Sequence, residues 1–351
     1  MSASFQTASF GENPAAALTR DFGVISPSIS TTNISQSVPV DSDSIYYSPG
    51  WDRVIKIDRS EMFLAGRKYF IVPEIYVSQN TGTIKNTSQT GSTQSEDSMS
   101  LFNNQLNLAF RLSSWLHFGV CAYSPKVDYF SKTDYKSNES SYSYQSDNEI
   151  KILGLGGGLT LRLPIGFSLG GFYHKIDESR EFTFTDSNPI NAALNRTGSE
   201  ISHHEKFGYG LSYQEGNQRS GGFRLEISRS QMNFGSGQIY NNEDIIVPNI
   251  QDKIAVEAAT LGFVFGVSYT LIQGRYINYR YFVDTLISEF PYYEKAVGVS
   301  SGFIGFKTKG GSSIGGLFSY YDGNSEVSFQ GQKSTAKVKE NSIGISYSYL
   351  F

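Results

Sequence analysis

The residues best suited to chemistry at a reactive site do not form a recognisable catalytic or metal-binding set. His203, His204 and Glu205 are adjacent in the sequence, whereas a helical zinc-protease motif places its two histidines four residues apart. The glycine-rich run from Gly154 to Gly158 alternates like a strand and lacks the strand–turn–helix context of a dinucleotide-binding loop. One cysteine and four histidines exclude a disulfide framework and give no zinc-ligand spacing. We therefore expect no catalytic residues, no metal site and no cofactor.

Four basic side chains are the candidates for contacting a ligand. Arg162, Arg224 and Arg280 lie in alternating segments, each on the face opposite the large apolar residues. An arginine in such a position suits a carboxylate, to which it donates two parallel hydrogen bonds. The alternative is that each arginine pairs with a neighbouring carboxylate of the chain, such as Glu226. His117 occupies the same kind of position, and a structural role is the alternative for it.

The composition narrows the fold to the all-β class. Of 351 residues, 18% are charged and 14% aromatic, and 35 are glycine, whereas soluble domains carry about 25% charged residues. The many Phe and Tyr residues argue against disorder. The net charge of −4 gives no electrostatic case for binding nucleic acid, and no run reaches the roughly 18 apolar residues of a membrane helix. A soluble β-protein or a transmembrane β-barrel remains.

Strict alternation of apolar and small polar residues predicts the strands that carry these side chains. The C-terminal segment places Ile343, Ile345, Tyr347, Tyr349 and Phe351 on one face, opposite serine and glycine. A solvated sandwich face would carry more Lys and Glu, whereas a barrel lumen accommodates small polar groups behind an apolar lipid-facing side. The same pattern predicts fourteen strands, near residues 22–34, 53–64, 69–79, 101–111, 115–130, 148–163, 166–182, 200–214, 220–233, 253–270, 273–288, 292–308, 312–328 and 337–351.

The expected connections alternate in length, as they do in outer-membrane barrels. Short connections at residues 65–68, 112–114 and 164–165 alternate with long polar ones, expected at residues 80–100, 131–147, 183–199 and 233–252. The terminal Phe351 is similar to the end of the last strand in bacterial outer-membrane proteins. We therefore predict an all-β fold, a transmembrane antiparallel up-and-down barrel of about 14 strands over residues 21–351. A phase break at residues 258–260 predicts a β-bulge.

Residues 1–20 are predicted to form a short plug or hatch-like segment. A barrel of this size has a lumen wider than its own side chains fill. Pro14 would open a short helix with Asn13 as its N-cap, and a disordered tail is the alternative. No signal peptide is recognisable at the N-terminus, so we expect that it was removed and that the protein lies in the bacterial outer membrane.

The N-terminal segment resembles a known family. Phe5-Gln6 followed by Asn13-Pro14-Ala15 looks like the start of the FadL family of outer-membrane long-chain fatty-acid transporters, whose hatch carries an Asn-Pro-Ala sequence. The resemblance implies that Phe5, Asn13, Pro14 and Ala15 plug or gate the lumen.

A predicted hairpin at residues 106–120 also resembles a hairpin of the FadL family, with an aromatic–Arg pair before a turn of small polar residues. The resemblance implies that a fatty-acid-like or lipid-like molecule is bound or transported through a plugged lumen. The alternative is a structural or partner-binding barrel that docks another envelope protein, or a general porin. The expected partners are outer-membrane lipid, a hydrophobic molecule or lipid in the lumen and, in the alternative, that envelope protein, with no nucleic acid.

Overall fold

The computed structural model describes most of the chain as β-structure. The described residues are 13–15, 23–37, 51–66, 71–88, 93–137, 140–189, 195–217, 221–234, 238–241, 250–265, 268–283, 286–307, 312–329 and 332–350. Over most of residues 234–311, only the backbone and its strand pairing are described. Among the described residues, no helix is long and apolar enough to cross a membrane.

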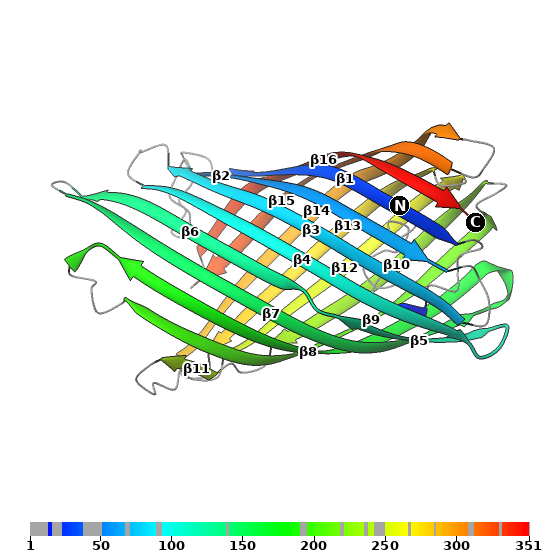
Figure 1. Cartoon of the computed structure of the whole chain (residues 1–351), viewed down its shortest axis with the longest axis horizontal. Helices are drawn as coiled ribbons and strands as arrows, with labels where there is room; N and C mark the ends of the chain where they lie inside the picture. The colour runs from blue at the N-terminus through cyan, green and yellow to red at the C-terminus, as the bar shows by residue number, and fades with distance from the viewer. Residues whose placement is uncertain are drawn as a thin grey trace.

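The strands form one antiparallel sheet that closes on itself (Figure 1). They are β1 (Val24–Ser37), β2 (Trp51–Ala65), β3 (Ile71–Ser88), β4 (Thr93–Arg111), β5 (Leu116–Tyr123), β6 (Lys126–Ser137), β7 (Ser140–Arg162), β8 (Phe167–Asp186), β9 (Arg196–Asn217), β10 (Gly221–Phe234), β11 (Gln238–Asn241), β12 (Ile250–Phe265), β13 (Ser268–Val283), β14 (Leu286–Lys307), β15 (Ser312–Phe329) and β16 (Gln332–Leu350). β1 pairs with β16, and β9 pairs with β10, so the described strands leave no open edge in the ring.

The ring has fourteen positions, as the sequence predicted. β5 and β6 both lie between β4 and β7 and are interrupted only at Ser124 and Pro125, where Ser124 N–H donates to the Asn104 carbonyl. They are therefore two parts of one wall strand. The short β11 only extends the pairing at the start of β9. The predicted fourteen-stranded antiparallel barrel is confirmed.

The two faces of the wall differ in chemistry, because side chains alternate along each strand. On the outer face, large apolar side chains are exposed, including Ile29, Met62, Ile75, Leu106, Leu155, Leu159, Leu211, Ile343 and Ile345. The inner face carries mainly small and polar buried residues, including Ser28, Glu74, Ser78, Asn107, Thr160, Ser212 and Ser346. The apolar core among the described residues is correspondingly small and consists of local clusters such as Phe63 with Ala65.

Two sequence predictions are wrong, one about the long connections and one about the position of a β-bulge. The described residues of the polar segments 80–100 and 131–147 are paired strands, since β3 reaches Ser88, β4 begins at Thr93, β6 reaches Ser137 and β7 begins at Ser140. Here the strands are polar on both faces, so the apolar alternation that marks a strand is missing. The pairing of β10, β12 and β13 runs without a shift through residues 258–260, and the register shifts instead between Phe282 and Val283 and between Ile304 and Phe306.

The tight turns lie at one end of the barrel, where β1 begins and β16 ends (Figure 1). The turn between β7 and β8 is Pro164–Gly166, in which Ile165 and Gly166 both have positive φ, 63° and 88°. Trp115 lies in the neighbouring turn, and its carbonyl accepts the Arg162 N–H at 2.7 Å. The long hairpins β6–β7 and β8–β9 project from the opposite end.

Candidate functional site

Asn13-Pro14-Ala15, here called the N-terminal tripeptide, lies against the inner wall of the barrel. The Asn13 side chain is 2% exposed and donates through Nδ2 to the Leu159 carbonyl at 2.8 Å and to Thr160 Oγ1 at 3.2 Å. Its Oδ1 accepts the Ala15 N–H at 3.0 Å. The amide of Asn13 therefore fastens the tripeptide to β7 and closes its own turn.

Two glycines make room for the tripeptide. Gly119 of β5 and Gly158 of β7 are directly paired across the wall. A Cβ at Gly119 would overlap the backbone of Pro14 and Ala15, and a Cβ at Gly158 would overlap Asn13 Oδ1. Any larger residue at either position would collide with the tripeptide. We call these two glycines, together with Thr160, which accepts a hydrogen bond from Asn13, the seat.

A layer of rings packs against the wall on the side of the seat away from the tight turns. The ring of His174 lies 5.0 Å from Phe172 and 5.6 Å from Tyr123, between ring centroids. Cys121 Sγ lies 3.6 Å from His174 Nε2. Gly156 leaves the space that the His174 ring occupies. The wall beside the seat is therefore closely packed.

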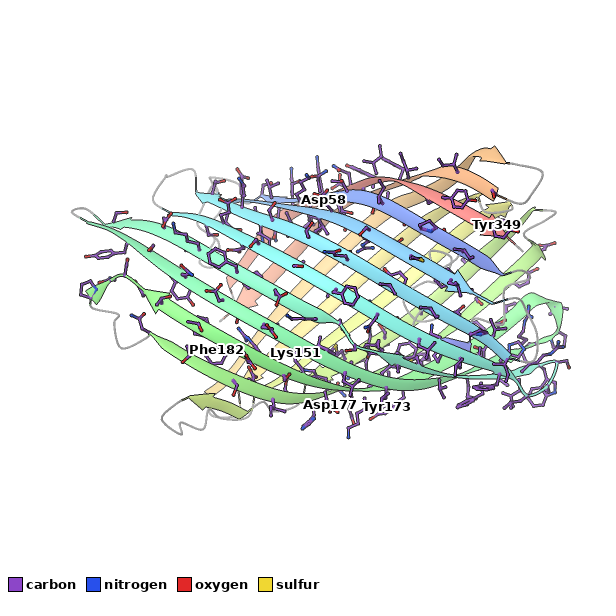
Figure 2. All side chains as sticks on the ribbon, in the orientation of Figure 1. Asp58, Lys151, Tyr173, Asp177, Phe182 and Tyr349 are labelled. Carbon is purple, nitrogen blue, oxygen red and sulfur yellow. The ribbon has the colours of Figure 1, made fainter. Side chains whose placement is uncertain are left out.

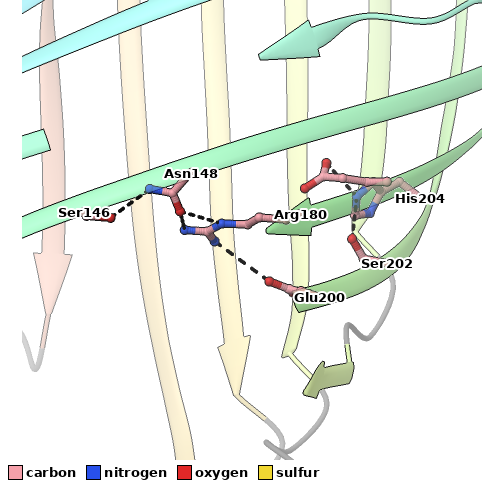
Figure 3. Close-up of polar contacts among 7 residues, drawn as sticks. Ser146, Asn148, Arg180, Glu200, Ser202 and His204 are labelled. Carbon is pink, nitrogen blue, oxygen red and sulfur yellow. Dashed lines mark hydrogen bonds and ion pairs between the residues drawn. The ribbon is translucent and has the colours of Figure 1, made fainter. Parts of the chain in front are cut away.

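Further from the tight turns, Arg180 is held in a polar network (Figure 3). Its Nε and Nη2 both donate to Asn148 Oδ1, at 2.9 and 2.6 Å, and Asn148 Nδ2 donates to Ser146 Oγ at 2.8 Å. Arg180 Nη1 lies 3.9 Å from Glu200 Oε2, and its Cζ lies 5.6 Å from the centroid of the Phe182 ring. The guanidinium is thus fixed mainly by a neutral amide, with one distant carboxylate.

Glu178, Ser202 and His204 lie together on β8 and β9 without the geometry of a catalytic triad. Ser202 Oγ lies 3.2 Å from His204 Nε2, and Glu178 Oε2 lies 3.3 Å from the same nitrogen (Figure 3). A triad needs the carboxylate on one ring nitrogen and the hydroxyl on the other. Here both groups compete for one nitrogen, so the carboxylate does not orient the histidine towards the serine.

Three Gly-x-Ser-x-Gly sequences are present, centred on Ser168, Ser300 and Ser313. Their serines lie in β8, β14 and β15. A nucleophile elbow requires a sharp strand-to-helix turn, so none of the three serines has the context of an elbow. Among the described residues, no three His, Cys, Asp or Glu side chains are grouped to hold a metal ion.

On the inner wall formed by β1 to β4, carboxylates accept hydrogen bonds from hydroxyl and amide groups. Glu61 accepts Ser28 Oγ at 2.8 Å and the Tyr76 hydroxyl at 2.9 Å. Glu74, 3% exposed, accepts Asn107 Nδ2 at 3.1 Å. These carboxylates show that the lumen-facing wall is polar at several levels.

The outer face changes from apolar to charged along β7. Leu153 and Leu155 are exposed apolar residues, and Lys151 and Glu149 follow at the next positions on the same face. Lys151 and Lys126 both contact Glu149, at 2.7 and 3.3 Å, and these hydrogen bonds hold the pKa of the Glu149 carboxyl below its usual range. In Figure 2, Asp177 and Tyr173 of β8 also point away from the barrel.

The predicted ligand-contact residues are not brought together. Arg162 is the last residue of β7, beside the tight turn and far along that strand from Asn148. His117 is 2% exposed and lies opposite Thr160 in the seat. Arg224 and Arg280 lie in β10 and β13, and their side chains are outside the described part of the chain.

Of the residues predicted to plug the lumen, Asn13, Pro14 and Ala15 lie together in the seat, whereas Phe5 falls outside the described residues. Sequence reasoning missed Arg180. Its neighbours on the inner face are Phe182 and Phe184, and aromatic residues on that face remove the contrast between an apolar outer face and a polar inner face. The signal that could have identified it is the outward, charged face of the same strand, formed by Lys175, Asp177 and Glu181.

The chain is similar in structure to several solved barrels. A Pseudomonas aeruginosa FadL homologue matches with a TM-score of 0.60 at 12% identity, over 96% of this chain and 92% of the other. The Pseudomonas putida toluene transporter TodX matches with a TM-score of 0.54 at 11% identity, over 97% and 93%. The Ralstonia pickettii toluene transporter TbuX matches with a TM-score of 0.53 at 12% identity, over 97% and 92%.

No family model and no curated protein matches the sequence. At 11–12% identity, the structural matches establish the architecture. They extend over nearly the whole length of both chains and agree with the resemblance of the N-terminal sequence. The protein therefore has the FadL-like barrel fold.

Proposed function

We propose that this protein is an outer-membrane channel that binds hydrophobic small molecules in its lumen and passes them inward. In this proposal, the N-terminal tripeptide is the plug, and the tight turns face the periplasm, as short turns do in outer-membrane barrels. The fold supports the proposal, because the similar barrels include a FadL homologue, two toluene transporters and a monoaromatic hydrocarbon channel. The seating of the tripeptide on Gly119 and Gly158 is the observation that carries it.

The inner wall offers a place for a molecule with an apolar body and an acidic head. Leu101, Val127, Ile150 and Arg180 are directly paired on four neighbouring wall strands, and directly opposite residues share a face of a sheet. Three strand spacings make this row about 14 Å long. Arg180 stands at one end, where its guanidinium suits a carboxylate. The proposed ligand is therefore a fatty-acid-like molecule with its head on Arg180.

The overall proposal is tested by transport. Cells that express the protein should take up a labelled apolar compound such as toluene faster than cells without it, and the purified barrel should show little ion conductance in planar bilayers. A large steady conductance would favour a general porin instead. Isolation from native membranes with a stoichiometric protein partner, and no transport, would favour the docking alternative.

The head-group contact is tested separately by binding. Arg180→Gln should weaken binding of decanoate about 10- to 150-fold, since a hydrogen bond to a charged group contributes about 1.5–3 kcal/mol, and should leave decanol binding unchanged. Arg59→Gln is the matched control, because Arg59 lies on the inner face of β2 and donates to Asn80 Oδ1 at 3.2 Å. Equal losses in both variants would remove the specific role of Arg180. Arg162, Arg224 and Arg280 remain predictions that the same assay can examine.

A further inference from the structure

Two grooves run across the strands on the outer face of the barrel and meet on β2 and β3. The first, here called the apolar groove, crosses β15, β16, β1, β2 and β3 and has a volume of about 880 Å³. The second, here called the polar groove, crosses β2, β3, β4, β6, β7, β8 and β9 and has a volume of about 1040 Å³. Asp58 and Thr81 border both grooves. The two grooves therefore form one continuous path around the outside of the wall.

The apolar groove lies in the lipid-facing part of the wall. Its border nearer the tight turns is a row of directly paired residues on five neighbouring strands, in the order Gly316, Ile345, Ile29, Ser60 and Gln79. Four strand spacings make this row about 19 Å long, somewhat more than half of the roughly 30 Å hydrocarbon core of a bilayer. The groove therefore has the length and the apolar character that an acyl chain of one leaflet requires.

The polar groove lies between two rows of outward side chains. The row nearer the tight turns is directly paired from strand to strand, in the order Asp58, Thr81, Ser100, Asp128, Glu149 and Glu181. The other row lies two residues further from the tight turns and includes Thr83, Ser98, Phe130 and Asp147. The polar groove therefore presents carboxylates, hydroxyls and an aromatic ring on the outer face, beyond the apolar part of β7.

This lining favours a head group rich in hydroxyls over one that is only anionic. A sugar hydroxyl donates one hydrogen bond, whereas an ionised carboxylate only accepts them, and hydrogen bonds to ionised groups are the stronger ones. The described residues of the polar groove include one lysine, Lys56, and five carboxylates: Asp58, Asp128, Asp147, Glu149 and Glu181. Sugar hydroxyls can donate to these carboxylates, whereas a phosphate lying among them would be repelled.

Two lysines stand where the apolar wall gives way to the polar groove. Lys126 is directly opposite the exposed Phe102 on β4 and directly opposite Lys151 on β7. Glu149 contacts Lys126 at 3.3 Å and Lys151 at 2.7 Å, so it holds the two ammonium groups near each other. Each ammonium has three donors, and lysine is a frequent phosphate-binding residue. This pair therefore suits a phosphate that joins an apolar chain to a sugar.

We propose that the two grooves hold one phosphorylated glycolipid of the surrounding membrane leaflet. An acyl chain lies in the apolar groove, the phosphate contacts Lys126 and Lys151, and the sugar occupies the polar groove. The apolar groove is continuous with the lipid-facing wall, which favours a lipid over a soluble protein as the occupant. This inference rests on the outer-membrane placement in the proposed function, but it requires no transported substrate and no plug.

Lipid binding to the purified barrel, in a detergent that has no sugar head group, tests the proposal. The probes are lipid A, a phosphorylated glycolipid, and phosphatidic acid, which has acyl chains and a phosphate but no sugar. Native mass spectrometry counts the bound lipid over a titration of each probe. We expect lipid A to bind about tenfold more tightly than phosphatidic acid, because two net hydrogen bonds to the sugar are worth about that factor.

The phosphate contact is examined with lysine variants. Lys126→Gln combined with Lys151→Gln should weaken the binding of both probes about tenfold, because both probes carry a phosphate. The matched control is Lys85→Gln combined with Lys132→Gln. It removes the same charge from two exposed lysines that are paired with Glu96 and Asp134 and that line neither groove.

The acyl-chain contact is examined by filling the apolar groove. Ser60→Trp should weaken the binding of both probes, because the indole would occupy the space that the small serine leaves. Leu159→Trp is the matched control, since Leu159 is exposed on the outer face of β7 and lies outside the groove. Should Ser60→Trp fail to insert, Ile29→Trp carries the same comparison, because Ile29 borders the same groove.

Three results would overturn the proposal: phosphatidic acid binding as tightly as lipid A, equal losses in the two lysine pairs, or natural affinity in the tryptophan variants of the groove. Failure of toluene transport with the preference for lipid A intact would refute the proposed function and leave this inference standing. Transport without that preference would refute this inference alone.

Discussion

Gly158 has a role at the scale of single residues that glycine alone can fill, because its missing side chain is replaced by the Asn13 amide. We expect Gly158→Ala to displace the N-terminal tripeptide and raise ion conductance, with some loss of barrel stability because the added Cβ would also lie 3.0 Å from the Gly171 carbonyl oxygen of β8. Gly157→Ala is the matched control, since a Cβ there would meet the Gly119 carbonyl at 3.5 Å and Phe118 at 4.0 Å, ordinary contacts. Planar-bilayer recordings of both variants check the prediction. Unchanged conductance in Gly158→Ala would mean that the tripeptide does not close the lumen.

The scale of single residues is also where sequence reasoning was weakest. The sequence places Asn13 and Ala15 in a plug by resemblance, but nothing in it identifies Gly119 and Gly158 as the surface they touch, because that contact joins residues about 100 to 150 positions apart. Arg180 was missed for a related reason. Its aromatic neighbours face inward in a wide lumen, where apolar residues do not mark the lipid side.

At the scale of elements, the turn between β7 and β8 places an isoleucine in a left-handed backbone conformation, which is unfavourable for a β-branched residue. Ile165 has φ 63° and ψ 23° and is followed by Gly166 with φ 88°. A left-handed conformation costs an ordinary residue about 1–2 kcal/mol, whereas Asn adopts it far more readily than a β-branched residue does. We expect Ile165→Asn to stabilise the barrel by about 1 kcal/mol.

Urea unfolding in detergent micelles measures this effect. Ile165→Val is the control, because it remains β-branched and should give no stabilisation. Since Ile165 is 82% exposed, its replacement removes few packing contacts. A lower unfolding midpoint in Ile165→Asn would show that the isoleucine contributes an interaction, such as with lipid, that outweighs the strain of its backbone.

The wall strands themselves follow from the sequence where one face is apolar. Alternation around Leu155 and Leu159, and around Ile343 and Ile345, located β7 and β16 because lipid contact requires that face to be apolar. Where both faces of a strand are polar, as in β3 beyond Asn80, polar residues such as threonine occur on both sides and the alternation of apolar and polar residues disappears. The sequence therefore predicts the part of each strand within the membrane and underestimates the part beyond it.

At the scale of the whole molecule, the barrel is taller than a bilayer requires. β7 has 23 residues and β8 has 20, whereas a transmembrane strand needs about 9–11. On the outer face of β7, apolar residues extend from the tight turn to Leu153, and charged residues begin at Lys151. We infer that the membrane boundary falls between these two positions, so that the charged part of the wall stands outside the bilayer.

Spin labels locate that boundary. In a Cys121→Ser background, a label at Lys151→Cys should relax with a water-soluble nickel complex, and one at Leu155→Cys with oxygen, which partitions into lipid. Side chains at both positions point outward and both lie on β7, so differences in strand mobility are small. If both labels show the lipid signature, the charged row of Lys151 and Glu149 would be buried at an interface rather than in water. If both show the aqueous signature, the outer apolar face of β7 would not contact lipid, and the membrane assignment of the whole barrel would be wrong.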